Sequence, residues 1–113
     1  MNDCIFCKIA NGDIPSKKVY EDDKVFAFYD IDPKAPVHIL IIPKEHIKSA
    51  AEINDSNSEI VSSIFLTASK IAKELNFEKG FRIVTNCGKD GGQSVDHLHF
   101  HLLAGRPLAW PPG

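Results

Sequence analysis

The chain has 113 residues with 13 Lys and Arg against 15 Asp and Glu, so its formal net charge is −2 with histidine neutral. The length and a 43% apolar share predict one compact domain with a modest core, spanning residues 1–113. A 25% charged share excludes a disordered or fibrous chain, and the near-neutral charge argues against a protein that binds nucleic-acid phosphates.

The first half of the chain predicts a helical turn, a hairpin of two strands, a rigid proline loop and a further strand. The hairpin follows from two segments rich in valine and aromatic residues around a polar turn. The further strand is a continuous apolar run, which predicts burial on both of its faces. In chain order the elements are the helical turn 4–12, the strands 19–20 and 25–29 around the turn 21–24, the loop 32–36 and the strand 38–42.

The second half contains the clearest helix, from about Ser56 to Asn76, where apolar residues recur at helical spacing on one face. A strand over 81–86, a glycine-rich loop over 88–94 and a last strand from Val95 or His97 to Leu103 follow. A proline-rich tail carries the sole tryptophan. About five mostly antiparallel strands and one long helix predict an α+β fold.

Three of the five histidines alternate with apolar residues in His97-Leu98-His99-Phe100-His101. In a strand, period two places the imidazoles on one face and the apolar side chains on the other, where they can pack on the long helix. A half-buried edge strand with a chance run of histidines is the plainer alternative, but such regular alternation is improbable by chance. We therefore expect the histidine face to line a surface or a cleft.

Metal binding and nucleophilic catalysis are the two chemistries that such a face supports. Alternate residues lie about 6.6 Å apart along a strand, so two neighbouring imidazoles can share an ion but three in line hardly can. In the other chemistry one imidazole attacks while its neighbours stabilise charge. The preceding Gly91-Gly92-Gln93-Ser94 offers backbone amides and a hydroxyl suited to phosphate, although a glycine pair alone is common in ordinary turns.

Cys4 and Cys7 have the C-x-x-C spacing that supplies half of a tetrahedral zinc site. No strand precedes them, which argues against a thioredoxin-like redox motif. His46 and one end histidine of the alternating segment could complete the site, and His97 is favoured because it leaves the other two for chemistry. Two buried thiols without a metal are the alternative, and Cys87, which has no partner motif, is expected to be structural.

The first residues show no basic and apolar regions of a secretory signal, and no lipidation motif lies at either end. The apolar runs, such as Ile39–Ile42, are too short to span a bilayer. We therefore expect a cytoplasmic protein without membrane or nucleic-acid partners, whose cysteines stay reduced.

The whole pattern resembles the histidine triad family, and within it the Hint-like branch of purine nucleotide phosphoramidases. The family signature, three histidines separated by apolar residues and followed by two more, matches His97–Leu103. Gly91–Ser94 matches as well, and the closing Trp110–Gly113 favours the Hint-like branch over the Fhit-like dinucleotide hydrolases. The resemblance extends over almost the full chain through Ile5-Phe6, Ile14-Pro15, Phe28-Tyr29-Asp30, Ala35-Pro36 and Ile42-Pro43-Lys44.

The resemblance implies a five-stranded antiparallel sheet with one long helix, paired as a homodimer, and a purine nucleotide substrate. It implies structural zinc on Cys4, Cys7, His46 and His97. It also implies base and sugar walls at Ile5, Phe6, Ile9, Phe28, Ile31 and Leu40, with Asp30 on the ribose hydroxyls. Phosphate contacts would come from the loop glycine Gly92 and from Asn86, Gln93, Ser94 and His101, and the tail with Trp110 would reach toward the partner's pocket.

We expect His99 to be the nucleophile, because it lies at the centre of the three histidines beside the anion loop. Neutral imidazole is available near pH 7, and a backbone carbonyl should fix the other ring nitrogen as a donor. His101 and Ser94 would stabilise the phosphate oxygens, Ser94 would also contact the leaving atom, and His38 would support the proton network. Taken alone, however, His38 or His46 is more simply a satisfied or exposed side chain.

The expected reaction is hydrolysis of a nucleoside phosphoramidate through a nucleotidyl-histidine. Hydrolysis of dinucleoside polyphosphates and nucleotide binding with little turnover are the alternatives. A pure metal-binding protein would leave His99, His101 and the glycine loop unexplained. Ala109 and Asp96 depart from the histidine and tyrosine common in Hint-like proteins, which bears on the leaving group rather than on the chemistry.

Overall fold

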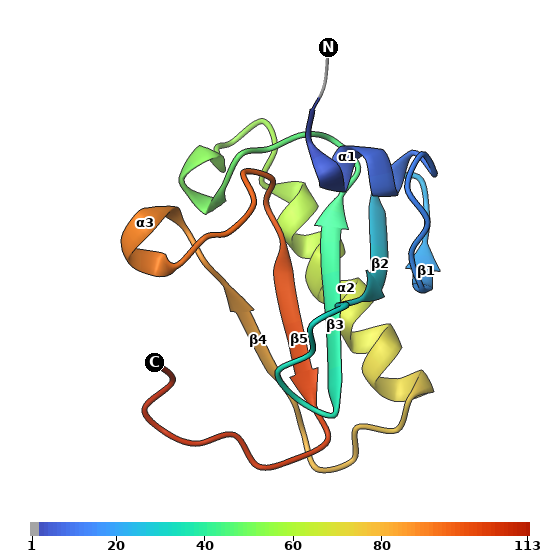
Figure 1. Cartoon of the computed structure of the whole chain (residues 1–113), viewed down its shortest axis with the longest axis vertical. Helices are drawn as coiled ribbons and strands as arrows, with labels where there is room; N and C mark the ends of the chain where they lie inside the picture. Colours follow the sequence, from blue (N-terminus) through green and yellow to red (C-terminus); the bar gives the residue numbers. More distant parts are fainter. Residues whose placement is uncertain (1–2) are drawn as a thin grey trace.

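Segments rich in β-branched and aromatic residues form an antiparallel sheet in this computed structural model, which describes residues 3–113. Within this range five strands lie in the order β1-β2-β3-β5-β4, so β4 is an edge and β5 is inserted between β3 and β4 (Figure 1). The expected α+β fold is confirmed, and β1 and β2 form the expected hairpin. The strands are β1 Lys18–Glu21, β2 Val25–Tyr29, β3 Val37–Pro43, β4 Arg82–Thr85 and β5 Phe100–Ala104.

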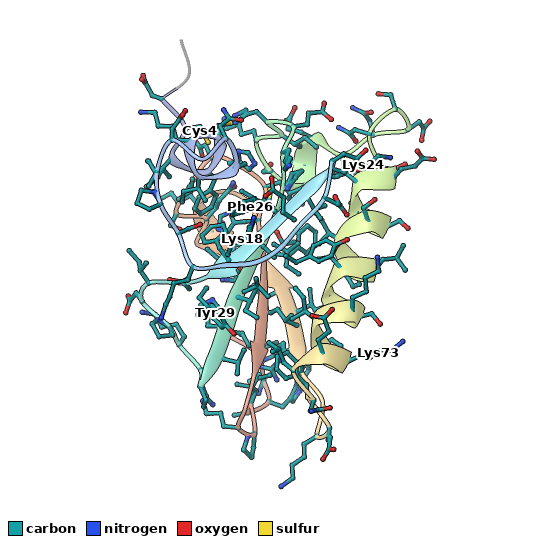
Figure 2. The ribbon with its side chains drawn as sticks, turned by 90° about the vertical axis from the view of Figure 1, so that its right-hand side faces the viewer. Cys4, Lys18, Lys24, Phe26, Tyr29 and Lys73 are labelled. Carbon is teal, nitrogen blue, oxygen red and sulfur yellow. The ribbon has the colours of Figure 1, made fainter. Side chains whose placement is uncertain are left out.

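One helix covers each face of the sheet. The long α2, Glu59–Glu74, lies on one side, and the short α1, Ile5–Ala10, lies on the other (Figures 1 and 2). Along β3 the side chains of Ile39 and Ile41 join the core beneath α2, whereas Leu40 and Ile42 join a second core beneath α1. The expectation that this apolar run is buried on both faces is therefore confirmed.

Helix α2 is shorter at both ends than the apolar periodicity predicts. It begins at Glu59 rather than Ser56, because asparagine side chains close the preceding turn: Asn57 Oδ1 accepts from the Asn54 amide at 2.8 Å, and Asn54 Oδ1 accepts from the Ser56 amide at 2.9 Å. Beyond its other end Asn76 has a φ of +57°, a left-handed conformation that asparagine tolerates and that prevents the helix from continuing.

The last strand begins later than the histidine alternation predicts. The sequence predicts a start at Val95 or His97, whereas β5 starts at Phe100. The main chain before Phe100 forms its hydrogen bond outside the sheet, because the Leu98 amide donates at 2.6 Å to the carbonyl of Ile47, in the segment that follows β3. Even so, Leu98, Phe100 and Leu102 all pack in the core with α2, so the expected division between an apolar and a histidine face is confirmed.

The glycine-rich loop predicted over 88–94 includes helical structure. It contains one short helical turn, α3, over Gly88–Gly91. Gly92 ends this turn with a φ of +79°, a conformation that glycine adopts without strain. The Gln93 side-chain oxygen then accepts from the Gly88 amide at 2.9 Å, which closes the loop on itself.

The C-terminal tail leaves β5 and runs on the side of β4 (Figure 1). One guanidinium nitrogen of Arg82 donates to the carbonyl of Ala109 at 3.0 Å and to that of Leu108 at 3.4 Å, which ties the tail to β4. Trp110 is 82% exposed. None of the helices in residues 3–113 is long and apolar enough to cross a membrane.

Candidate active site and metal cluster

The four expected metal ligands meet at the start of α1. Cys4 is the N-cap of this helix and Cys7 lies one turn further, as Figure 2 shows for Cys4. His46 follows β3, and His97 precedes β5. One ligand atom of each lies within 4.8 Å of the others. The structure thus brings together residues from three distant segments of the sequence.

Distances within this cluster fit a four-coordinate ion. Cys4 Sγ lies 3.2 Å from His97 Nδ1, and Cys7 Sγ lies 3.3 Å from His46 Nδ1. Tetrahedral zinc with ordinary bond lengths would separate a sulfur and a nitrogen ligand by about 3.6 Å. His97 donates its Nε2–H to the Pro43 carbonyl at 2.8 Å, so the lone pair lies on Nδ1 and faces the thiols. This donor set could bind a metal ion.

His99 is buried, with 2% of its surface exposed. Its Nδ1–H donates to the His97 carbonyl at 2.7 Å, which leaves the lone pair on Nε2. The expected backbone carbonyl that sets the tautomer is therefore confirmed. The Phe6 ring meets the imidazole edge to face at 5.0 Å between centroids, so the ring is also held by packing.

His38 and His101 form a directional chain of hydrogen bonds. The Lys34 amide donates to His38 Nδ1 at 3.0 Å, so the proton of His38 is on Nε2. His38 Nε2–H then donates to His101 Nδ1 at 2.8 Å, which places the proton of His101 on Nε2. This last atom is buried, and no acceptor for it lies in residues 3–113. The chain therefore ends in a donor that the protein leaves for another group.

Both imidazoles of this chain favour the neutral form. Burial, followed by the charges of His99 and His38, lowers the pKa of His101 to about 4. Burial also lowers the pKa of His38, although the Asp30 carboxylate lies 3.4 Å from its Nε2 and opposes the shift. At neutral pH the hydrogen bonds therefore run in the one direction described.

A cleft of about 570 Å³ lies beside this chain, a size that suits a small-molecule ligand. His99 lies next to its wall, with its ring 5.2 Å from that of His101. Six of the expected site residues line the cleft: Asp30, His38, Asn86, Gly92, Ser94 and His101.

Sequence reasoning missed Arg82 and Lys34 on the cleft wall. Arg82, Val84 and Asn86 line the cleft together because alternate residues of a strand share a face, so period two counted back from Asn86 could have found Arg82. Lys34 orients His38 through its backbone amide, and a backbone contact leaves no signal in the sequence.

The remaining expected substrate contacts lie off the cleft wall. Phe6, Ile9, Phe28 and Leu40 are buried in the core beneath α1. Ile5, Ile31 and Trp110 are exposed, by 46%, 101% and 82%. Both donors of the Gln93 amide are used within the protein, on the carbonyls of Lys48 at 2.7 Å and Val95 at 2.9 Å. Contact of these residues with a base, ribose or phosphate stays a prediction.

Residues 11–108 match the family model described as the HIT domain. The chain belongs to the histidine triad, or HIT, family. It is 48% identical over 113 residues to a 14 kDa zinc-binding protein of Brassica juncea, covering 98% of this chain and all of that protein. Its fold matches a HIT family hydrolase from Legionella pneumophila with a TM-score of 0.96 and 49% identity, covering 98% of this chain and 100% of that one. It also matches a histidine triad nucleotide-binding protein from Candida albicans, with a TM-score of 0.82, 38% identity, and coverage of 96% and 83%.

Proposed function

We propose that this HIT protein is a hydrolase that cleaves purine nucleoside phosphoramidates through a nucleotidyl intermediate on His99. The observation that carries the proposal is the 2.7 Å hydrogen bond from His99 Nδ1–H to the His97 carbonyl, because it leaves Nε2 unprotonated beside the cleft. The names of the similar Legionella hydrolase and Candida nucleotide-binding protein support the reaction class and the ligand class.

In the first step the lone pair of His99 Nε2 attacks the α-phosphorus, and the bond from phosphorus to the amine nitrogen breaks. His101 Nε2–H donates to a non-bridging oxygen as negative charge develops, and this donor costs no reorganisation because His38 already orients it. The leaving nitrogen needs one proton to depart as a neutral amine, and Ser94, exposed on the cleft wall, relays this proton to it from solvent.

In the second step water hydrolyses the nucleotidyl intermediate. It attacks phosphorus, the bond to His99 Nε2 breaks, and the nucleoside monophosphate leaves with the water oxygen. The proton that water loses balances the one taken by the amine. Asp30, half-buried on the cleft wall, binds the ribose hydroxyls of the substrate. The glycine loop and Asn86 bind the phosphate.

The test compares wild type with His99→Ala on an adenosine phosphoramidate, measuring release of the monophosphate. We expect the variant to lose turnover by about three orders of magnitude or more while still binding adenosine monophosphate. Acid quenching should trap a nucleotidyl adduct on the wild type and not on the variant. Near-normal hydrolysis by His99→Ala would refute the nucleophile assignment.

Two other functions are separated by the same assay. A dinucleoside polyphosphate hydrolase would release a phosphate instead of an amine, so it would turn over diadenosine polyphosphates faster than the phosphoramidate. A regulatory module would bind the nucleotide with equal and negligible turnover in wild type and His99→Ala. The directional chain that ends in the free donor of His101 favours catalysis over binding alone.

We also propose that Cys4, Cys7, His46 and His97 hold a structural zinc ion, since four protein ligands leave no open position for a substrate. The name of the zinc-binding Brassica relative supports the choice of metal. A thiol pair as ligands fits a cytoplasmic location, where thiols stay reduced. Elemental analysis should give about one zinc per chain in wild type and in Cys87→Ser, and far less in Cys7→Ser. A zinc content near zero in wild type purified without chelators would refute the site.

A homodimer through β4 completes the proposal. This strand is one of the two edges of the sheet, and its unpaired backbone can pair with a second copy. Phe65, Leu66 and Phe81 are exposed by 46%, 61% and 44%, which supplies apolar area for such an interface. Sedimentation velocity should give the mass of two chains, and a monomer at micromolar concentration would contradict the proposal.

A further inference from the structure

His99 lies outside the paired part of the sheet. The register of β5 with β3 ends at the pair Ile41–Phe100, and its register with β4 ends at the pair Thr85–Phe100. Phe100 is therefore the first paired residue of β5. His99, whose imidazole we propose as the nucleophile, lies just outside the paired segment on its N-terminal side. Its position depends on what holds the short segment 97–99.

Hydrogen bonds from separate segments hold the first part of this stretch. The Leu98 amide donates to the Ile47 carbonyl at 2.6 Å, and the His97 ring donates to the Pro43 carbonyl at 2.8 Å. Both bonds fix the chain as it enters His99. The peptide that follows His99 joins it to Phe100, the first residue paired with both Ile41 and Thr85, and its orientation also sets the direction of the side chain.

A threonine hydroxyl binds that following peptide. Thr85 Oγ1 donates to the His99 carbonyl at 2.8 Å. The hydroxyl is well suited to this role, because a β-branched side chain on a strand has restricted χ1 freedom. Thr85 pairs with Phe100, on the face opposite the cleft, whereas its neighbours Val84 and Asn86 line the cleft. It can therefore act on the reaction through His99 without touching a substrate.

We propose that Thr85 is a positioning residue for the nucleophile. This role rests on the function proposed above, in which His99 attacks phosphorus. Its hydroxyl fixes the peptide after His99, and with the bond from His99 Nδ1 to the His97 carbonyl it holds Nε2 on the line of attack. Attack on phosphorus is sensitive to alignment, and a shift of about 1 Å in a reacting group can cost about a hundredfold in rate.

The test replaces Thr85 by valine, which keeps the branched shape and removes the hydroxyl. We expect kcat on the adenosine phosphoramidate to fall about tenfold or more, while KM and the Kd for adenosine monophosphate change less than about twofold. Thr85→Ser, which keeps the donor, should recover kcat to within about threefold of wild type.

The matched control is Thr67→Val. Thr67 Oγ1 donates to the Ser63 carbonyl, also at 2.8 Å, but within α2 and away from the cleft. We expect Thr67→Val and Thr85→Val to lower the melting temperature by similar amounts, because each removes one hydrogen bond from a hydroxyl to a carbonyl. Thr67→Val should leave kcat unchanged. An unchanged kcat in Thr85→Val, an equal fall in Thr67→Val, or a failure of Thr85→Ser to recover activity would overturn the proposal.

His99→Ala belongs in the same series, because it separates the two proposals. If His99→Ala is inactive and Thr85→Val is normal, the positioning role alone is wrong. If His99→Ala keeps its turnover, the nucleophile assignment is wrong and the positioning role falls with it.

Discussion

Burial of His101 predicts a fold that loses stability in mild acid. The imidazole is neutral in the folded chain because burial, then the charges of His99 and His38, lower its pKa to about 4. In the unfolded chain the same group takes up a proton near pH 6.5. Between these values the unfolded state binds more protons than the folded state, so the free energy of unfolding falls as the pH falls from 6.5 toward 4.

The two pKa values set the size of the loss. Relative to pH 8, proton uptake by His101 costs about 2 kcal/mol at pH 5 and about 3 kcal/mol at pH 4. Because His101 is half-buried, solvent screening places the measured loss at or below these values. His38 adds a loss of the same sign, since burial lowers its pKa as well.

The assay is urea unfolding of wild type and His101→Asn at pH 7.5, 6 and 5. The asparagine oxygen reaches the place of the ring Nδ1 and can accept from His38 Nε2–H, but it does not titrate. Wild type should lose about 2 kcal/mol more than the variant between pH 7.5 and 5, and the contributions of the other groups cancel in the difference. If the two stabilities fall in parallel, the burial argument for His101 is wrong.

Three further predictions concern the core, the metal cluster and the tail. Leu98→Ala should lower the free energy of unfolding by about 2–5 kcal/mol in urea, because Leu98 is 1% exposed in the core beneath α2, and a loss below about 1 kcal/mol would contradict its core position. Adding a chelator should lower the melting temperature of wild type and leave that of Cys7→Ser unchanged, whereas equal shifts would mean that the cysteine cluster is not the metal site. Arg82→Met should release the tail and lower the fluorescence anisotropy of Trp110, the sole tryptophan in the sequence; an unchanged anisotropy would show that other contacts hold the tail.

Local patterns were sufficient for the sheet and both of its faces. The continuous apolar run of β3 predicted two-sided burial, and α1 and α2 supply the two covering layers. The C-x-x-C pair similarly predicted half of a ligand cluster, because the first turn of a helix brings residues three apart together. In each case the pattern that predicts the feature lies within a few neighbouring residues, so it can be read directly from the sequence.

Contacts between distant segments could not be predicted in the same way. The start of β5 at Phe100 depends on a bond from Leu98 to the carbonyl of Ile47, and a carbonyl has no residue identity to read. The Thr85 hydroxyl on the His99 carbonyl is hidden for the same reason. The asparagine turn that delays α2 was open to prediction, because Asn54 and Asn57 are frequent turn formers.

Residue type and spacing are the same for the three histidines of the triad, yet each presents a different combination of ring nitrogen and protonation state. His97 gives its Nε2–H to the Pro43 carbonyl and keeps a lone pair toward the thiols, as a metal ligand needs. His99 gives its Nδ1–H to the His97 carbonyl and keeps a lone pair on Nε2, as a nucleophile needs. His101 accepts at Nδ1 from His38 and presents its Nε2–H, as a hydrogen-bond donor to a phosphate oxygen needs. The partner of the other nitrogen therefore decides which chemistry each imidazole can perform, and alternation only places them on one face.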